Sequence, residues 1–120
     1  MTCELEGGAL DMAVAIAHGM TVREDGDDAN YLHPETLDAW PLGVSSYVRV
    51  SEYRPSASWE HGGHIIERDR MYLAHNGEKW EAGTVCEYGH EGPYCKHYGY
   101  GPTALIAAMR AFVASKTPNV

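Results

Sequence analysis

The sequence predicts a single small α+β domain in which an antiparallel sheet, centred on a β-hairpin, packs against two main helices. Residues 9–18 show helical periodicity, residues 71–85 contain an Asn-Gly pair between two strand-like segments, and residues 103–116 form a second, more apolar helical pattern. A chain of 120 residues can bury one modest hydrophobic core but not two, so residues 1–120 are treated as one domain.

The predicted core relies on an unusual set of apolar residues. Leu, Ile, Val and Phe together account for 20 of the 120 residues, and this low share with a net charge of −8 overlaps the composition of disordered proteins. Three Trp, eight Tyr, five Met and 14 Ala act against that tendency. We therefore expect an ordered domain whose core packs aromatic, Met and Ala side chains.

The negative charge is concentrated near the N-terminus. Residues 1–40 hold nine carboxylates and one basic side chain, whereas residues 41–120 hold eight of each. Because a sequence-independent nucleic-acid binder needs a basic face, this balance argues against that class, although a small anion could still bind to a few local groups. The acidic run 24–28 lies in a segment that, counted from Asp25, lacks the Gly at the sixth position and the Glu at the twelfth position of a calcium loop, so a solvated turn is predicted there.

Sequence features also bear on the compartment. No apolar run approaches the length of a membrane span, and the N-terminus lacks the pattern of a secretory signal. The three Cys are an odd number. We therefore expect a cytosolic protein with free thiols and no membrane partner.

The first predicted helix has one clear apolar face. Leu10, Ala13, Val14 and Ala17 recur at helical spacing, and Gly19 is a suitable residue to end the helix.

The segment that follows is less regular. Pro34 could begin a short helical turn over residues 34–39, and the Val and Tyr residues of 44–53 favour a strand.

The hairpin prediction rests on Asn76 and Gly77. Both residue types tolerate the positive φ angles of a two-residue turn, and residues 71–75 and 78–85 would form the two strands. Residues 86–101 are rich in Gly and lack periodicity, so a long loop is predicted there.

The last predicted helix, residues 103–116, is apolar on nearly every side. Leu105, Met109 and Phe112 line one stripe, and Arg110 is the one charged residue within the helix body. A helix of this kind is buried on most sides, so we place it at the centre of the domain.

Three blocks of the chain resemble the NinX-like family of small tailed-phage proteins. They are residues 5–15 (LEGGALDMAVA), 53–68 (YRPSASWEHGGHIIER) and 101–116 (GPTALIAAMRAFVASK), in the family's order and spacing. Met12 departs from the family pattern, where Trp is common, and His64 departs where Pro is common. The resemblance implies a place among the accessory genes of phages and prophages, and it implies no particular chemistry.

The start of the last helix is the first candidate binding site. Gly101, Pro102 and Thr103 precede the helix, whose first amides are unpaired donors that suit phosphate or carboxylate. Arg110 lies two turns further along the same face as Thr103. The alternative is an ordinary helix cap with Arg110 paired to a carboxylate such as that of Glu67.

Trp59, Gly62 and Gly63 form the second candidate. A glycine pair lets the backbone come close to a ligand, and a Trp in a preceding loop could stack on a base or another ring. The alternative is a tight turn anchored by a Trp in the core.

Cys86, His90, Cys95 and His97 are the candidate metal ligands. Four such ligands within 12 residues could hold zinc, but their spacing matches none of the common zinc-finger patterns. We expect no metal there and a flexible loop instead, and a disulfide between Cys86 and Cys95 is still less expected in a reducing cytosol.

The sequence offers little support for catalysis. It contains no Gly-x-Ser-x-Gly, His-Glu-x-x-His or Walker-type motif, and sequence alone cannot place His61, Glu60 and His64 within reach of one another. We expect neither an enzyme nor a cofactor.

Two function classes remain open from the sequence. The first is a phage sponge that binds a small nucleotide-derived anion, and the second is an acidic inhibitor or modulator that binds a host protein. A homo-oligomer is compatible with either class. The predicted ligand site combines both candidates and consists of Trp59, Gly62, Gly63, Gly101, Thr103 and Arg110.

Overall fold

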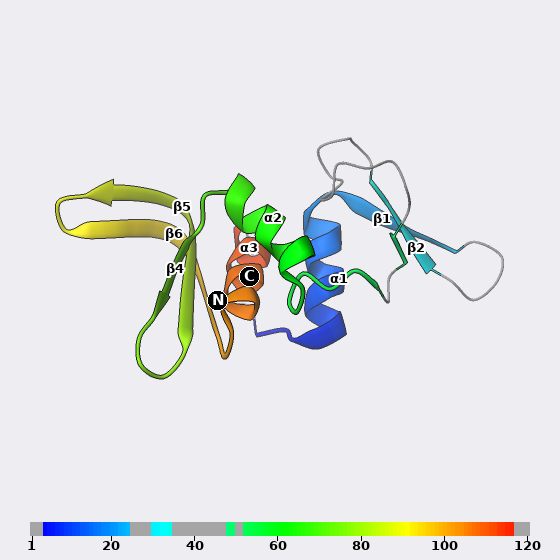
Figure 1. The fold of residues 1–120 in the computed structure, drawn as a ribbon. Helices are drawn as coiled ribbons and strands as arrows, with labels where there is room; N and C mark the ends of the chain where they lie inside the picture. The colour runs from blue at the N-terminus through cyan, green and yellow to red at the C-terminus, as the bar shows by residue number, and fades with distance from the viewer. Residues whose placement is uncertain (1–3, 25–29, 35–47, 50–51, 117–120) are drawn as a thin grey trace.

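A computed structural model describes residues 4–24, 30–34, 48–49 and 52–116. Within them the chain forms three helices and two three-stranded antiparallel sheets. The helices occupy the middle of the molecule, and the two sheets lie at opposite ends (Figure 1). The predicted α+β class is confirmed.

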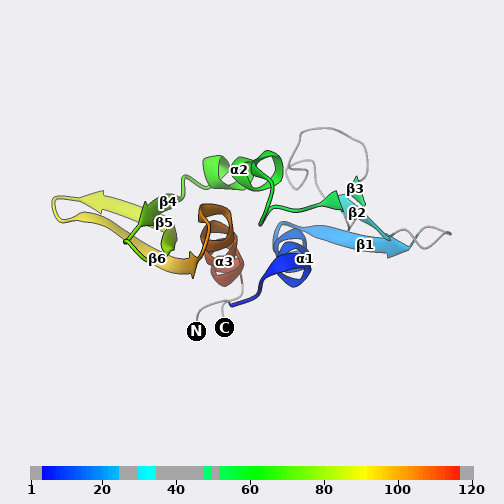
Figure 2. The same ribbon diagram turned by 60° about the horizontal axis from the view of Figure 1, so that its bottom comes forward.

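Helix α3 (Ala104–Lys116) is the centre of the core, as its sequence predicts. It packs against one sheet through β5 and β6, and against both of the other helices, α1 (Gly7–Ala17) and α2 (Trp59–Arg68). Figure 2 shows α1 beside α3 on the side away from that sheet. Four of its eight buried residues are Ala and one is Met, in line with the expected core: Ala104, Leu105, Ala107, Ala108, Met109, Ala111, Phe112 and Val113.

Helix α1 confirms the first helical prediction. Leu10 and Val14 of the predicted face are fully buried, and the helix begins two residues earlier than expected. His18 is the C-cap residue, and Gly19 follows with a φ of +94°, which suits a glycine after a helix end.

The first sheet contains β1 (Met20–Glu24), β2 (Asn30–Pro34) and β3 (Val48–Arg49), in that order. The short strand β3 falls within the strand predicted over 44–53. Pro34 ends a strand rather than beginning a helical turn, because it pairs with Met20 across the sheet. The remainder of the predicted turn and most of the acidic run lie outside the described residues.

The second sheet has the order β4 (Tyr72–His75), β5 (Trp80–Gly89) and β6 (Gly92–Gly101). The β4–β5 hairpin is confirmed, but the predicted two-residue turn is wrong. Residues 76–79 form a four-residue turn, because the Asn76 side-chain oxygen accepts hydrogen bonds from the backbone N–H of Glu78 and Lys79.

Strands β5 and β6 overturn the prediction of a long loop over 86–101. They pair in one register from Trp80 opposite Gly101 to Gly89 opposite Gly92, with an interruption at Val85 and Lys96. Strand β4 ends its pairing at Gly83, so beyond it the hairpin is a two-stranded arm that projects from the body (Figure 1). Beyond Cys86 and Cys95 the described side chains of the arm are exposed, and the sequence there therefore lacks the alternation by which strands are recognised.

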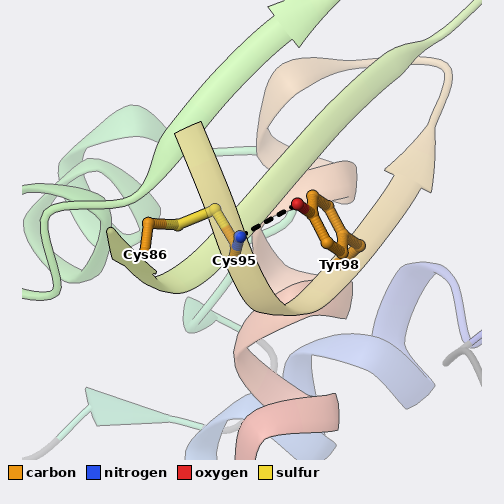
Figure 3. Close-up of a disulfide and its surroundings, with 3 residues drawn as sticks. All are labelled: Cys86, Cys95 and Tyr98. Atoms are coloured by element: carbon orange, nitrogen blue, oxygen red, sulfur yellow. Dashed lines mark hydrogen bonds between the residues drawn. A yellow bond between two sulfur atoms is a disulfide. The ribbon is translucent and has the colours of Figure 1, made fainter. Parts of the chain in front are cut away.

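A disulfide joins Cys86 and Cys95 near the base of this arm, contrary to the expectation of free thiols (Figure 3). The antiparallel register places the two residues directly opposite each other, which the loop prediction could not anticipate. The backbone N–H of Cys95 donates a hydrogen bond of 2.9 Å to the Tyr98 hydroxyl. Gly83 lies beneath the disulfide, where a Cβ would come within 2.6 Å of the Cys95 sulfur.

Helix α2 corrects the prediction of a loop or tight turn around Trp59, Gly62 and Gly63. All three residues lie in the helix, whose buried side includes Gly62 and Ile65. Glycine lowers helix propensity, so the helix depends on packing against α3 and the preceding turn.

Candidate functional site

A cleft of about 450 Å³ lies where strand β6 runs into helix α3. Its walls also come from the N-terminal segment before α1, the turn between β4 and β5, and the body of α3. The described residues that line it are Glu4, Glu78, Lys79, Tyr100, Gly101, Pro102 and Arg110.

Arg110 is fixed in this cleft by backbone carbonyl groups. Its Nε donates to the Leu5 carbonyl at 2.9 Å, and Nη1 donates to the Tyr100 carbonyl at 2.6 Å. Nη2 makes a longer contact of 3.4 Å with the Glu4 carbonyl. These bonds tie the N-terminal segment, β6 and α3 together and use three of the five N–H groups of the guanidinium.

The partners of Arg110 decide what its charge can do. The alternative considered from the sequence was an ion pair with a carboxylate such as that of Glu67, which would cancel the charge. Carbonyl oxygens orient the guanidinium but carry no net charge, so the half-buried Arg110 remains a positive centre at the wall of the cleft.

Tyr100 and Lys79 form the second part of the cleft. The Lys79 ammonium lies 4.9 Å from the centroid of the Tyr100 ring, in a cation–π arrangement. Burial, reinforced by the nearby Glu81 carboxylate, raises the pKa of Tyr100 above its ordinary value, so the phenol stays protonated at neutral pH. The cleft thus contains a neutral aromatic ring with a cation beside it.

Gly101 and Thr103 have different structural roles at the start of α3. A Cβ on Gly101 would come within 2.7 Å of the Ile106 side chain, so glycine lets the strand end press against the helix. The Thr103 hydroxyl accepts a hydrogen bond of 3.1 Å from the Ile106 N–H, which is an ordinary helix cap. Gly101 lines the cleft, and Thr103 does not.

The other three predicted site residues lie apart from this lining. Gly62 faces the core, where a Cβ would collide with the Pro55 carbonyl oxygen and approach a Leu105 methyl group to 2.7 Å. A Cβ on Gly63 would meet only the Trp59 ring, at 3.4 Å. Trp59 itself is 59% exposed, so it is not the core anchor of a turn. The structure therefore brings Gly101 and Arg110 to one cleft and leaves Trp59, Gly62 and Gly63 on α2.

A buried polar cluster joins α1, α2 and the turn before α2. The Asp11 carboxylate is largely buried and accepts a hydrogen bond of 2.8 Å from the Ser56 N–H. Burial, with the nearby Asp11 charge, raises the pKa of Tyr53 well above its ordinary value. The buried Tyr53 hydroxyl has no hydrogen-bond partner among the described residues. Tyr53 was not singled out from the sequence.

His18 and His61 complete this cluster. The His18 Nε2 atom lies 3.1 Å from Nη1 of Arg68, and burial followed by the Arg68 charge lowers the pKa of His18. The His61 Nδ1 atom accepts a hydrogen bond of 3.0 Å from the Arg54 N–H, and burial lowers its pKa as well. Both imidazoles are therefore held neutral, and the cluster connects the helices rather than lining the cleft.

The candidate zinc ligands are not gathered into one site. Cys86 and Cys95 bond to each other, and His97 pairs with Thr84 across the sheet. No group of three or more His, Cys, Asp or Glu in the described part of the chain could hold a metal ion. The expectation of no zinc stays a prediction to be tested on the protein.

Four lining residues were missed from the sequence: Glu4, Glu78, Lys79 and Tyr100. Glu78 and Lys79 approach Arg110 through the β5–β6 register, which a loop over 86–101 cannot supply, whereas Glu4 and Tyr100 are held there by the hydrogen bonds of Arg110 to their backbone carbonyls. The one available signal was the adjacency of Tyr100 to Gly101.

Comparison with known proteins gives a family. The model of the family described as Bacteriophage P22 NinX matches residues 1–116. The chain belongs to the NinX family. This NinX protein is accordingly a phage accessory protein, and no curated protein matches it. Among its described helices, none has the length and apolar character needed to cross a membrane.

Proposed function

We propose that this NinX protein is a non-catalytic binder of a small nucleotide-derived anion, acting in the host cytoplasm as a sponge for a defence signal. The observation that carries the proposal is the state of Arg110. Three carbonyl groups hold its guanidinium in place without cancelling its charge, and it faces a cleft of ligand size.

The groups around Arg110 suit an anion that also carries a ring. Two guanidinium N–H groups remain for a phosphate, and the adjacent start of α3 adds the positive end of a helix dipole. Lys79 can leave the Tyr100 ring and contribute a second cation, which exposes the ring to stacking by a base. The excess negative charge lies in residues 1–40, of which Glu4 lines the cleft, and salt screens those carboxylates that lie more than about 10 Å from it.

The lining residues favour binding over catalysis. The described side chains at the cleft include no His, Cys or Ser, which are the commonest nucleophiles and proton carriers near neutral pH. The raised pKa of Tyr100 makes its phenol a weak source of nucleophilic oxygen. Sequestration needs only affinity, and a small phage protein with one preorganised cation suits that task.

Native mass spectrometry can test the proposal. The protein is incubated with a small-molecule extract of infected cells, desalted and weighed intact. We expect a bound mass on the unaltered protein, its loss in Arg110→Ala, and its retention when Asp25, Asp27 and Asp28 are changed to Asn. Equal retention by Arg110→Ala would refute binding at this cleft.

The second candidate function is inhibition or modulation of a host protein. Its specific support is the 59% exposure of Trp59 together with the net charge of −8, since an exposed Trp can anchor a protein interface and acidic charge can steer a basic partner. This function would be lost in Trp59→Ala or on neutralising residues 24–28, and it would survive Arg110→Ala.

A further inference from the structure

The charges that line the cleft are of both signs. Arg110 and Lys79 are cationic, and Glu4 and Glu78 are anionic. Arg110 bonds to carbonyl oxygens and Lys79 contacts the Tyr100 ring, so neither cation is paired with a carboxylate of the cleft within the described residues. The two carboxylates therefore remain available to a ligand.

This mixture restricts the kind of anion that fits. A ligand with negative charge at every edge would be attracted by Arg110 and repelled by Glu4 and Glu78 in the same small space. A ligand with an anionic end and a hydrogen-bond donor at the other end satisfies both kinds of group. Charge-assisted hydrogen bonds to carboxylates are among the stronger polar contacts in proteins.

We infer that the ligand is a nucleotide whose base bears an exocyclic amino group. This rests on the proposed function and adds the base class to it. The phosphate lies toward Arg110 and Lys79, the base stacks on the Tyr100 ring, and its amino group donates to Glu78 or Glu4. Glu78 is placed beside Lys79 by the four-residue turn, so one segment supplies both an acceptor for the amine and a cation for the phosphate.

The inference is tested by isothermal titration calorimetry on the full chain with AMP, IMP and inorganic phosphate. AMP and IMP differ in carrying an amino group or a keto oxygen at one ring position. We expect AMP to bind about tenfold more tightly than IMP, the ratio given by one charge-assisted hydrogen bond. Phosphate should bind more weakly than either nucleotide.

The variants Glu78→Gln and Glu4→Gln assign the preference to the cleft. At least one of them should bring the AMP and IMP affinities together and leave phosphate binding equal or tighter, because a repelling carboxylate has been removed. Glu78 is exposed on a turn held by backbone contacts to Asn76, so Glu78→Gln should fold normally. Glu91→Gln, at the tip of the arm, is the matched control and should keep the full preference.

The two proposals fail in different ways. Equal binding of AMP and IMP by the unaltered protein, or a preference that survives both Gln variants, would overturn the inference about the base and leave anion binding at Arg110 intact. No binding of either nucleotide or of phosphate would overturn both the inference and the proposed function.

Discussion

Helix α2 and the junction of β6 with α3 each place glycine beside a large side chain, but the two regions use glycine for different purposes. On α2, Gly62 is needed because the Pro55 carbonyl and Leu105 fill the space that a side chain would occupy. At the junction, Gly101 lets the strand end lie against Ile106 and at the same time forms part of a cleft wall. Glycine therefore allows close packing in both regions. Only at the junction does it also line a cleft, and there the charge of Arg110 lies beside it.

The largest expected effect is that of Gly62→Ala. Its methyl group would collide with the Pro55 carbonyl, so we expect the free energy of unfolding to fall by about 3 kcal/mol. The neighbouring variant Gly63→Ala is the control, since its methyl would meet only the Trp59 ring at 3.4 Å. Because Ala favours helix over Gly by about 1 kcal/mol, Gly63→Ala should be neutral or stabilising in denaturant titration. Equal losses in both variants would show that the glycines do not differ in packing.

Arg110→Met should have the next largest effect. Removing the guanidinium leaves the Leu5 and Tyr100 carbonyls without their donors, which should cost about 2 kcal/mol in thermal or chemical unfolding. Lys96→Met, on the exposed part of the arm, removes the same charge and should change stability little. A neutral Arg110→Met would mean that the N-terminal segment is not anchored to the cleft.

Gly77→Val tests the turn that brings Glu78 and Lys79 to the cleft. Gly77 has a φ of +100°, which a β-branched residue resists, so we expect a loss of about 1 kcal/mol. Gly89→Val is the comparison, since Gly89 has no atoms within 4 Å of an added Cβ and no positive φ. Calorimetric melting of both variants measures the difference in their stability. Equal stability of the two variants would show that Gly77 is not a position where a side chain strains the backbone.

The smallest expected effect is a pH dependence from His18. Burial lowers its pKa in the folded protein from about 6.5, so the unfolded chain binds this proton first as the pH falls. The His18 contribution to stability is therefore complete above pH 6.5 and is lost progressively below it. His18→Gln should flatten the decline in melting temperature between pH 7 and 5, and an unchanged slope would assign the decline to other groups, such as His61.

Local pattern was sufficient for the elements that contribute a periodic face to the core. Apolar residues one helical turn apart predict α1 through Leu10 and Val14, and α3 through Leu105 and Met109. The Asn76-Gly77 pair predicts the turn between β4 and β5. Both helices and the β4–β5 hairpin form where these residues predict them.

The remaining elements depend on contacts between distant residues. Helix α2 contains two adjacent glycines, and its stability comes from the fit of Gly62 against Pro55 and Leu105, which no local pattern encodes. In the two-stranded arm, the described side chains beyond Cys86 and Cys95 are exposed, so no buried face imposes alternation there. The same limit applies to the cleft. Gly101 ends β6 shortly before α3, which carries Arg110, so these two residues are close in the sequence, whereas Lys79 reaches them only through the strand register.

We expect the ligand to bind where β6 meets α3, beside Arg110, and not beside Trp59. Nuclear magnetic resonance of the ¹⁵N-labelled protein titrated with AMP tests it directly, because the Arg110 Nε–H, the Gly101 amide and the Trp59 indole N–H give separate signals. We expect the Arg110 and Gly101 signals to shift and the Trp59 indole signal to stay unchanged. Shifts of the Trp59 indole and of helix α2, with Arg110 unmoved, would contradict it.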